Sequence, residues 1–72
     1  MKRFYVKDAV KSIRAFSDGI SIVDYHDSGK IIAINTEYTT IRMNNGNEVI
    51  IKNDLMEKFF IRKREEMILW KL

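Results

Sequence analysis

The sequence predicts a mainly β (α+β) protein, a small bent barrel of five short strands behind one amphipathic helix. Up to residue 16 the apolar residues repeat with a helical period, and after Gly19 they alternate as in a β-strand. Glycine and asparagine fall at turn positions between the alternating segments. With 72 residues, no proline and no cysteine, the chain is expected to form a single domain over residues 1–72 without disulfide bonds.

The helix is predicted over residues 1–18. Its apolar stripe follows the spacing i, i+3, i+4, i+7, i+10 and consists of Val6, Ala9, Val10, Ile13 and Phe16. Asp8 suits the first turn, where a negative charge is favoured, and Gly19 suits the end of the helix. A basic flank of the same helix, either solvated or facing phosphate, is formed by Arg3, Lys7, Lys11 and Arg14.

Residues 19–64 are predicted to form the barrel. The five strands are expected at 20–25, 31–35, 36–43, 48–52 and 58–64. Asn45-Gly46 supplies the positive φ angles of a tight hairpin turn, and residues 53–57 resemble a single helical turn. A helix followed by short strands and tight turns is typical of small SH3-like or Sm-like barrels.

The last segment, residues 65–72, is an apolar tail. Its apolar residues are Met67, Ile68, Leu69, Trp70 and Leu72. An exposed run of this kind promotes aggregation, so we expect it to be covered, either as a sixth strand or by another chain.

Residues 19–56 resemble the β-domain of the small-conductance mechanosensitive channel family. The matching positions are Gly29, Thr40, Ile41, Arg42, Gly46, Val49, Ile50, Ile51 and Asn53, while Lys52 replaces the family's proline. The resemblance implies an Sm-like barrel, which assembles into a ring in that family. Because no membrane helices precede the segment, channel activity is not implied.

The same segment is similar to the Sm-like RNA chaperone family of Hfq. In that family a Tyr-Lys-His motif at the end of the fourth strand binds RNA, and Ile51-Lys52-Asn53 stands at that place. Lys52 matches the motif, whereas Ile51 and Asn53 depart from its tyrosine and histidine. The resemblance implies RNA binding only through the lysine, since the stacking ring is missing.

Charge is distributed unevenly along the chain. The net charge is +4 over residues 1–16, −4 over 17–57 and +3 over 58–72. Basic ends can mark a nucleic-acid footprint, or they can complement the acidic middle of the same chain. The residues predicted to contact nucleic acid are Lys52, Asn53, Lys58, Arg62 and Arg64, the last three lying near the aromatic pair Phe59-Phe60.

No arrangement of residues predicts catalysis, a cofactor or a metal. Ser28-Gly29-Lys30 lacks the glycine-rich loop and the following helix of a nucleotide site. Asp24, His26 and Asp27 are typical of a solvated turn, and no nucleophile is placed beside His26. Glu65 and Glu66 are neighbours that share no face of a helix or strand. The sequence therefore predicts a protein that is not an enzyme.

The predicted function is non-enzymatic binding, by self-assembly into a homo-oligomer or by docking on a protein partner. The fourth and fifth strands are apolar enough to pair between copies, and the predicted interface residues are Phe60, Ile68, Trp70 and Leu72. The small size suggests an accessory protein of a phage or mobile element. The alternative is an Sm-like RNA-binding protein. No run approaches the ~20 apolar residues of a membrane span, so a cytoplasmic protein without a membrane partner is expected.

Overall fold

The computed structural model of this protein describes residues 4–63. Its strands are β1 (Ala9–Ser12), β2 (Phe16–Ser17), β3 (Ile22–Val23), β4 (Ser28–Ile34), β5 (Tyr38–Met43), β6 (Glu48–Lys52) and β7 (Phe60–Arg62). A 3-10 turn, η1 (Asn53–Leu55), and one short helix, α1 (Met56–Phe59), connect β6 to β7. The predicted mainly β class is confirmed. The predicted tail, residues 65–72, lies outside the described residues.

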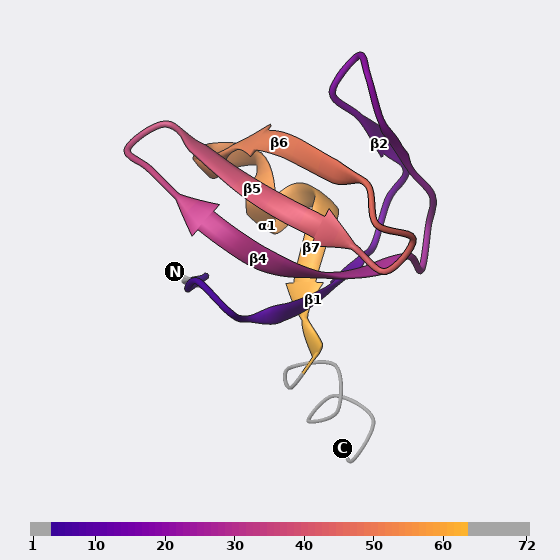
Figure 1. Cartoon of the computed structure of the whole chain (residues 1–72), viewed down its shortest axis with the longest axis horizontal. Helices are drawn as coiled ribbons and strands as arrows, with labels where there is room; N and C mark the ends of the chain where they lie inside the picture. Colours follow the sequence, from indigo (N-terminus) through magenta and orange to yellow (C-terminus); the bar gives the residue numbers. More distant parts are fainter. Residues whose placement is uncertain (1–3, 64–72) are drawn as a thin grey trace.

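The main sheet contains five antiparallel strands in the order β6-β5-β4-β1-β7 (Figure 1). The last strand pairs with the first, with Val10 opposite Arg62 and Ser12 opposite Phe60. The sheet is open, because β6 and β7 stand at its two edges and are not paired with each other. Four of the predicted strands contribute to this sheet, but its fifth strand is β1 rather than the strand predicted at 20–25. Its closure into a barrel is not confirmed.

The predicted N-terminal helix is wrong for the described residues, since Ala9–Ser12 form β1, which lies between β4 and the edge strand β7. Val10 and Ser12 are buried with the alternation of a strand, while Val6 and Ile13 of the expected apolar stripe are exposed. Strand β1 has backbone partners on both sides, in β4 and in β7. The local spacing also fits a helix, and Ala9 and Lys11 are good helix formers, so pairing with two neighbouring strands outweighs the local preference here.

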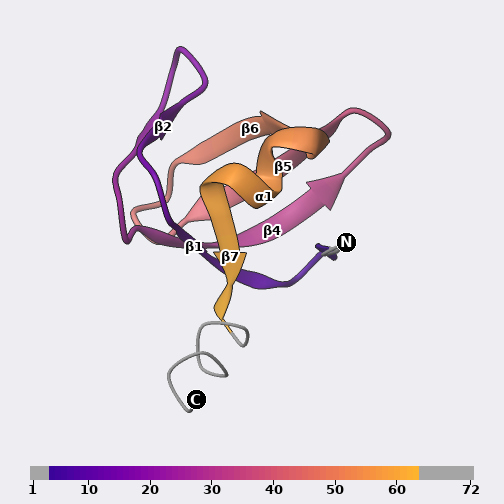
Figure 2. The same cartoon turned by 180° about the vertical axis from the view of Figure 1, so that it is seen from behind.

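The core lies on one face of the sheet, where alternate residues of each strand point inward. It consists of Val10, Val23, Ile31, Ile41, Met43, Val49, Ile51, Met56 and Phe60. Helix α1 covers this face across β5 and β6, as the two opposite views show (Figures 1 and 2). The other face carries the polar partners of the same alternation, among them Arg42 and Glu48, whose side chains form an ion pair at 2.9 Å.

The predicted hairpin between β5 and β6 is confirmed, but of Asn45 and Gly46 only Gly46 has the expected positive φ. Gly46 has φ +93°, a conformation that glycine adopts without strain, and its N–H donates to the carbonyl of Met43 at 2.9 Å. The predicted helical turn at 53–57 is also confirmed by η1 and α1. The strand predicted at 20–25 is reduced to β3, which pairs with β2 in a separate two-stranded hairpin.

Candidate functional site

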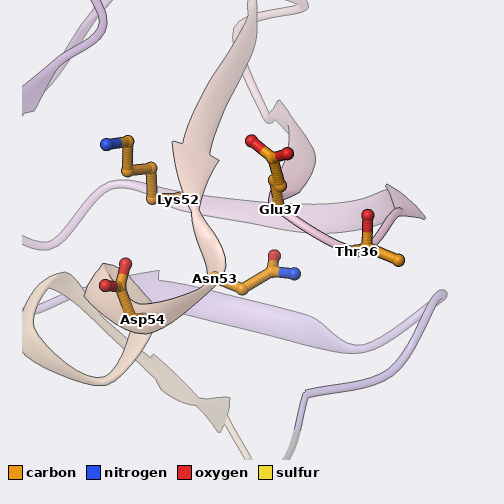
Figure 3. Close-up of a pocket in the computed structure, with 5 residues that line it drawn as sticks. All are labelled: Thr36, Glu37, Lys52, Asn53 and Asp54. Atoms are coloured by element: carbon orange, nitrogen blue, oxygen red, sulfur yellow. The ribbon is translucent and has the colours of Figure 1, made fainter.

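The sequence-predicted site at Lys52 and Asn53 lies where β6 ends and η1 begins. A shallow pocket of about 300 Å³ is lined there by Thr36, Glu37, Lys52, Asn53 and Asp54 (Figure 3). The tight loop between β4 and β5 and the strand end of β6 supply these residues. The structure therefore brings Lys52 and Asn53 together with a loop that sequence reasoning left out of the site.

The side chain of Asn53 is hydrogen-bonded within the protein. Its Oδ1 accepts from the buried Thr39 hydroxyl at 2.7 Å, and its Nδ2 donates to the carbonyl of Asn35 at 2.8 Å. The backbone N–H of Asn53 donates to the carbonyl of Glu37 at 2.9 Å. Because a buried hydroxyl without a partner is costly, this amide is a structural tie between the β4–β5 loop and η1.

The pocket as a whole is poorly matched to phosphate. In Figure 3 the side chain of Lys52 extends away from Glu37 and Asp54, and Asn53 points toward Thr36. Two carboxylates against one ammonium repel an anion rather than attract it. Lys52 remains exposed and can make a single charge contact, but the geometry gives it no converging partners.

The other predicted nucleic-acid residues are separated from this pocket. Lys58 is exposed on α1, and Arg62 is half-buried in β7 opposite Val10. Arg62 instead lines a second pocket, of about 230 Å³, with Lys7, Asp8, Ala9 and Lys63. Arg64 lies outside the described residues. The structure thus places basic residues from the N-terminal and C-terminal segments around one pocket. In the charge profile these two segments appear as separate basic regions.

Among the predicted interface residues, Phe60 is corrected to a core residue. Only 2% of its surface is exposed, and strand alternation turns its side chain toward Val10 and Met56 in the core cluster. Its neighbour Phe59 is half-buried and stacks on Phe16, with ring centroids 5.2 Å apart. The other three predicted interface residues, Ile68, Trp70 and Leu72, lie outside the part of the chain that the structure describes.

The β2–β3 hairpin is docked on the free edge of β6. Asp18 lies at the hairpin turn, where its Oδ1 accepts from the N–H groups of Ile20 and Ser21 at 2.9 and 2.8 Å. Its Oδ2 accepts from the N–H of Ile50 in β6 at 3.1 Å, and the Ser21 hydroxyl donates to the carbonyl of Glu48 at 3.3 Å. These bonds occupy edge groups of β6 that a strand from another chain would need.

Large apolar side chains gather at this docked hairpin. Ile20 is 95% exposed at its turn and Ile22 is 69% exposed on β3, while Ile50 is 50% exposed on the adjoining strand β6. Leaving isoleucine in water forgoes a burial free energy of about 1.5–3 kcal/mol for each side chain. The sequence shows these residues only as part of an alternating strand, so their exposure was not foreseen.

The hairpin contact is expected to depend on pH. The N–H groups of Ser21, Ile20 and Ile50 hold the pKa of Asp18 below its ordinary value of 3.8. A carboxylate with a lowered pKa stabilises the folded state above the unfolded-state pKa, and this stabilisation is lost as pH falls through the folded-state pKa. Low pH should therefore loosen the hairpin from β6.

Replacing Asp18 with alanine should lower the free energy of unfolding by about 1 kcal/mol near neutral pH, because the three donors lose their acceptor. The difference between wild type and D18A, measured by urea denaturation, should shrink as the pH falls below 3.8. Hydrogen exchange at the Ile50 amide should be faster in D18A. A stability difference that stays constant down to the acid end would contradict this role of the carboxylate.

The polar turn at Asp24, His26 and Asp27 is structural. Asp27 Oδ2 accepts from the N–H of Asp24 at 2.9 Å, and the His26 ring stacks on Tyr25 with centroids 3.6 Å apart. Within residues 4–63 no group of three or more His, Cys, Asp or Glu side chains is arranged to hold a metal ion. The contacts of Asp27 and His26 therefore stabilise the loop between β3 and β4.

Comparison with known proteins finds no matching family model, curated protein or solved structure. The helix within residues 4–63 is too short to cross a membrane.

Proposed function

We propose that this protein is a non-enzymatic binding module with an SH3-like or Sm-like small-barrel architecture, which acts by self-association or by docking on a protein partner. The barrel is supported by the strand order, in which β7 returns to pair with β1 at the edge of the sheet. The helical connection of η1 and α1 between β6 and β7 covers the core of that sheet.

The observation that carries the binding proposal is the exposure of Ile20 and Ile22 on the β2–β3 hairpin. Apolar side chains at a site held firmly by Asp18 are pre-organised for a protein contact, since little conformational entropy is lost on binding. Ile50 on β6 is 50% exposed, and its N–H donates to the same Asp18 carboxylate as that of Ile20. We call Ile20, Ile22 and Ile50 the hairpin patch.

The route of association differs from the strand pairing expected from the sequence. The N–H of Ile50 and the carbonyl of Glu48 are already bonded to the hairpin. A second copy could pair along this part of β6 only if the hairpin moved away. Contact through side chains of the hairpin patch needs no such movement.

Replacing Ile20 and Ile22 together with serine should abolish association without lowering the melting temperature, because both side chains are exposed. Light scattering over a concentration series measures self-association, and copurification of the tagged wild type and variant measures docking on another protein. The matched control is Ile34→Ser, which changes an exposed isoleucine on β4. A variant that keeps both the oligomeric state and the copurified partner would contradict the proposal.

A second candidate function is nucleic-acid binding, and one observation favours it. The pairing of β1 with β7 places the basic N-terminal residues beside the basic C-terminal ones, with Lys7, Arg62 and Lys63 around one pocket. Concentrated positive charge attracts the phosphate backbone, whereas charges spread evenly over a surface do so weakly.

A further inference from the structure

The basic pocket is built at the junction of the N-terminal turn and the end of β7. Its lining residues are Lys7, Asp8, Ala9, Arg62 and Lys63, and its volume is about 230 Å³. Val10 lies opposite Arg62, and continuing this register places Ala9 beside Lys63. Since alanine has a small side chain, the space above it stays open between the longer basic side chains.

The turn that carries Lys7 is fixed by the sheet. The N–H of Lys7 donates to the carbonyl of Ile31 at 2.8 Å, and the N–H of Ile31 donates to the carbonyl of Asp8 at 3.0 Å. Lys7 has φ +79°, a left-handed conformation that is unfavourable for a lysine by about 1–2 kcal/mol. Strained residues that the surrounding structure enforces are concentrated at functional sites.

The acidic residue of the pocket has a structural task. Asp8 Oδ2 accepts from the N–H of Tyr5 at 2.9 Å, and the N–H of Asp8 donates to the carbonyl of Tyr5 at 3.0 Å. These two bonds close the turn. The carboxylate is therefore held at the backbone of the turn, and three cationic side chains outnumber it in the pocket.

An aromatic ring belongs to the same turn. Tyr5 is 52% exposed, and its backbone is bonded to Asp8 at the edge of the pocket. Proteins that bind single-stranded nucleic acid combine a basic groove for the phosphates with exposed aromatic rings on which bases stack. An acidic peptide would use the cations but would give the ring no planar partner.

We propose that the Tyr5–Asp8 turn and the end of β7 bind single-stranded nucleic acid. Lys7, Arg62 and Lys63 contact backbone phosphates, and the ring of Tyr5 stacks on a base. This inference rests on the second function proposed above and moves its site away from Lys52 and Asn53. It assigns a role to Tyr5, which sequence reasoning did not single out.

The test uses the full chain and fluorescence anisotropy with labelled oligouridine and oligothymidine of about ten nucleotides, at several salt concentrations. The double variant Lys7→Gln/Lys63→Gln removes two phosphate contacts. Binding should weaken at low salt. The negative slope of log K against log salt should become shallower by about 1.4, since each phosphate contact on a single strand contributes about 0.7. The matched control, Lys52→Gln/Lys58→Gln, removes the same charge elsewhere and should change the slope little.

Tyr5→Ala should weaken binding by about 5- to 150-fold with an unchanged salt slope, because stacking involves no phosphate. A duplex of the same length should bind less tightly than either single strand, because its bases are already stacked. The two oligonucleotides decide between RNA and DNA, since only a contact to the 2′-hydroxyl favours oligouridine.

The outcomes separate the site from the function. Binding that Lys52→Gln/Lys58→Gln reduces as much as Lys7→Gln/Lys63→Gln would overturn this site and leave nucleic-acid binding standing. Absence of binding to every oligonucleotide at low salt would overturn both. Equal affinity for duplex and single strand, or a Tyr5→Ala variant with wild-type affinity, would overturn the stacking role. Circular dichroism of each variant confirms that the fold is retained.

Discussion

Replacing Phe60 with alanine is expected to remove a large part of the free energy of unfolding of the protein. Phe60 is 2% exposed and belongs to the core cluster. Removing a buried phenylalanine ring costs about 3–5 kcal/mol. Domains are stable by roughly 0.05–0.15 kcal/mol per residue, so the whole stability of a chain of this length is about 4–11 kcal/mol. Urea denaturation followed by circular dichroism measures the loss.

The matched control for Phe60 is its neighbour in the sequence. Phe59→Ala removes the same atoms from a half-buried side chain that stacks on Phe16, so its loss of stability should be clearly smaller. The sequence predicted Phe60 as an interface residue. A Phe60→Ala variant that keeps its stability and loses only association would restore that interpretation and contradict the core assignment.

Replacing Gly29 with alanine is expected to have a comparably severe effect. Gly29 lies in β4 opposite Met43, and a Cβ atom there would meet the carbonyl oxygen of Arg42 at 2.7 Å and Met43 Sδ at 2.9 Å. The first of these is backbone in the neighbouring strand, so β4 and β5 would have to separate. Overpacking of a core costs about 1–3 kcal/mol, and displacement of backbone places this variant at the upper end.

Gly46→Ala provides the contrast for the Gly29 variant. Gly46 has φ +93° and nothing within 4 Å of an added Cβ, so only the backbone conformation opposes alanine there. That penalty is about 1–2 kcal/mol. Thermal unfolding of both variants should show the larger decrease in melting temperature for Gly29→Ala. The reverse order would show that β4 and β5 adjust easily to the added methyl group.

The middle of the fold could be predicted because its signals are local. Asn45-Gly46 specifies a turn by backbone conformation alone, and the alternation over 36–43 and 48–52 specifies which side chains point inward. The first strand could not be predicted in this way. The spacing of Val6, Ala9, Val10 and Ile13 satisfies a helix, and only pairing with β4 and β7 selects the extended form.

In the candidate sites, too, features set by local sequence could be predicted and features set by long-range contacts could not. The end of β6 was correctly placed at Lys52, yet the structural task of Asn53 depends on Thr39 and Asn35, which approach it only in the folded chain. Nothing near Tyr5 in the sequence indicates that Arg62 and Lys63 will lie beside its turn. A single sequence does not show which distant segments will lie side by side. For the Tyr5 turn and the end of β7, the only indication in the sequence is that both segments are basic.

The pairing of Val10 with Arg62 also has a consequence for biosynthesis. During translation β4, β5 and β6 can form hairpins from neighbouring residues, but β1 gains its second partner only after residues 60–62 have been made. Pairings between segments this far apart in the sequence form slowly. Until then one edge of β1 is unpaired and the core lacks Phe60, so a chain that stops before this residue would be prone to aggregation and degradation.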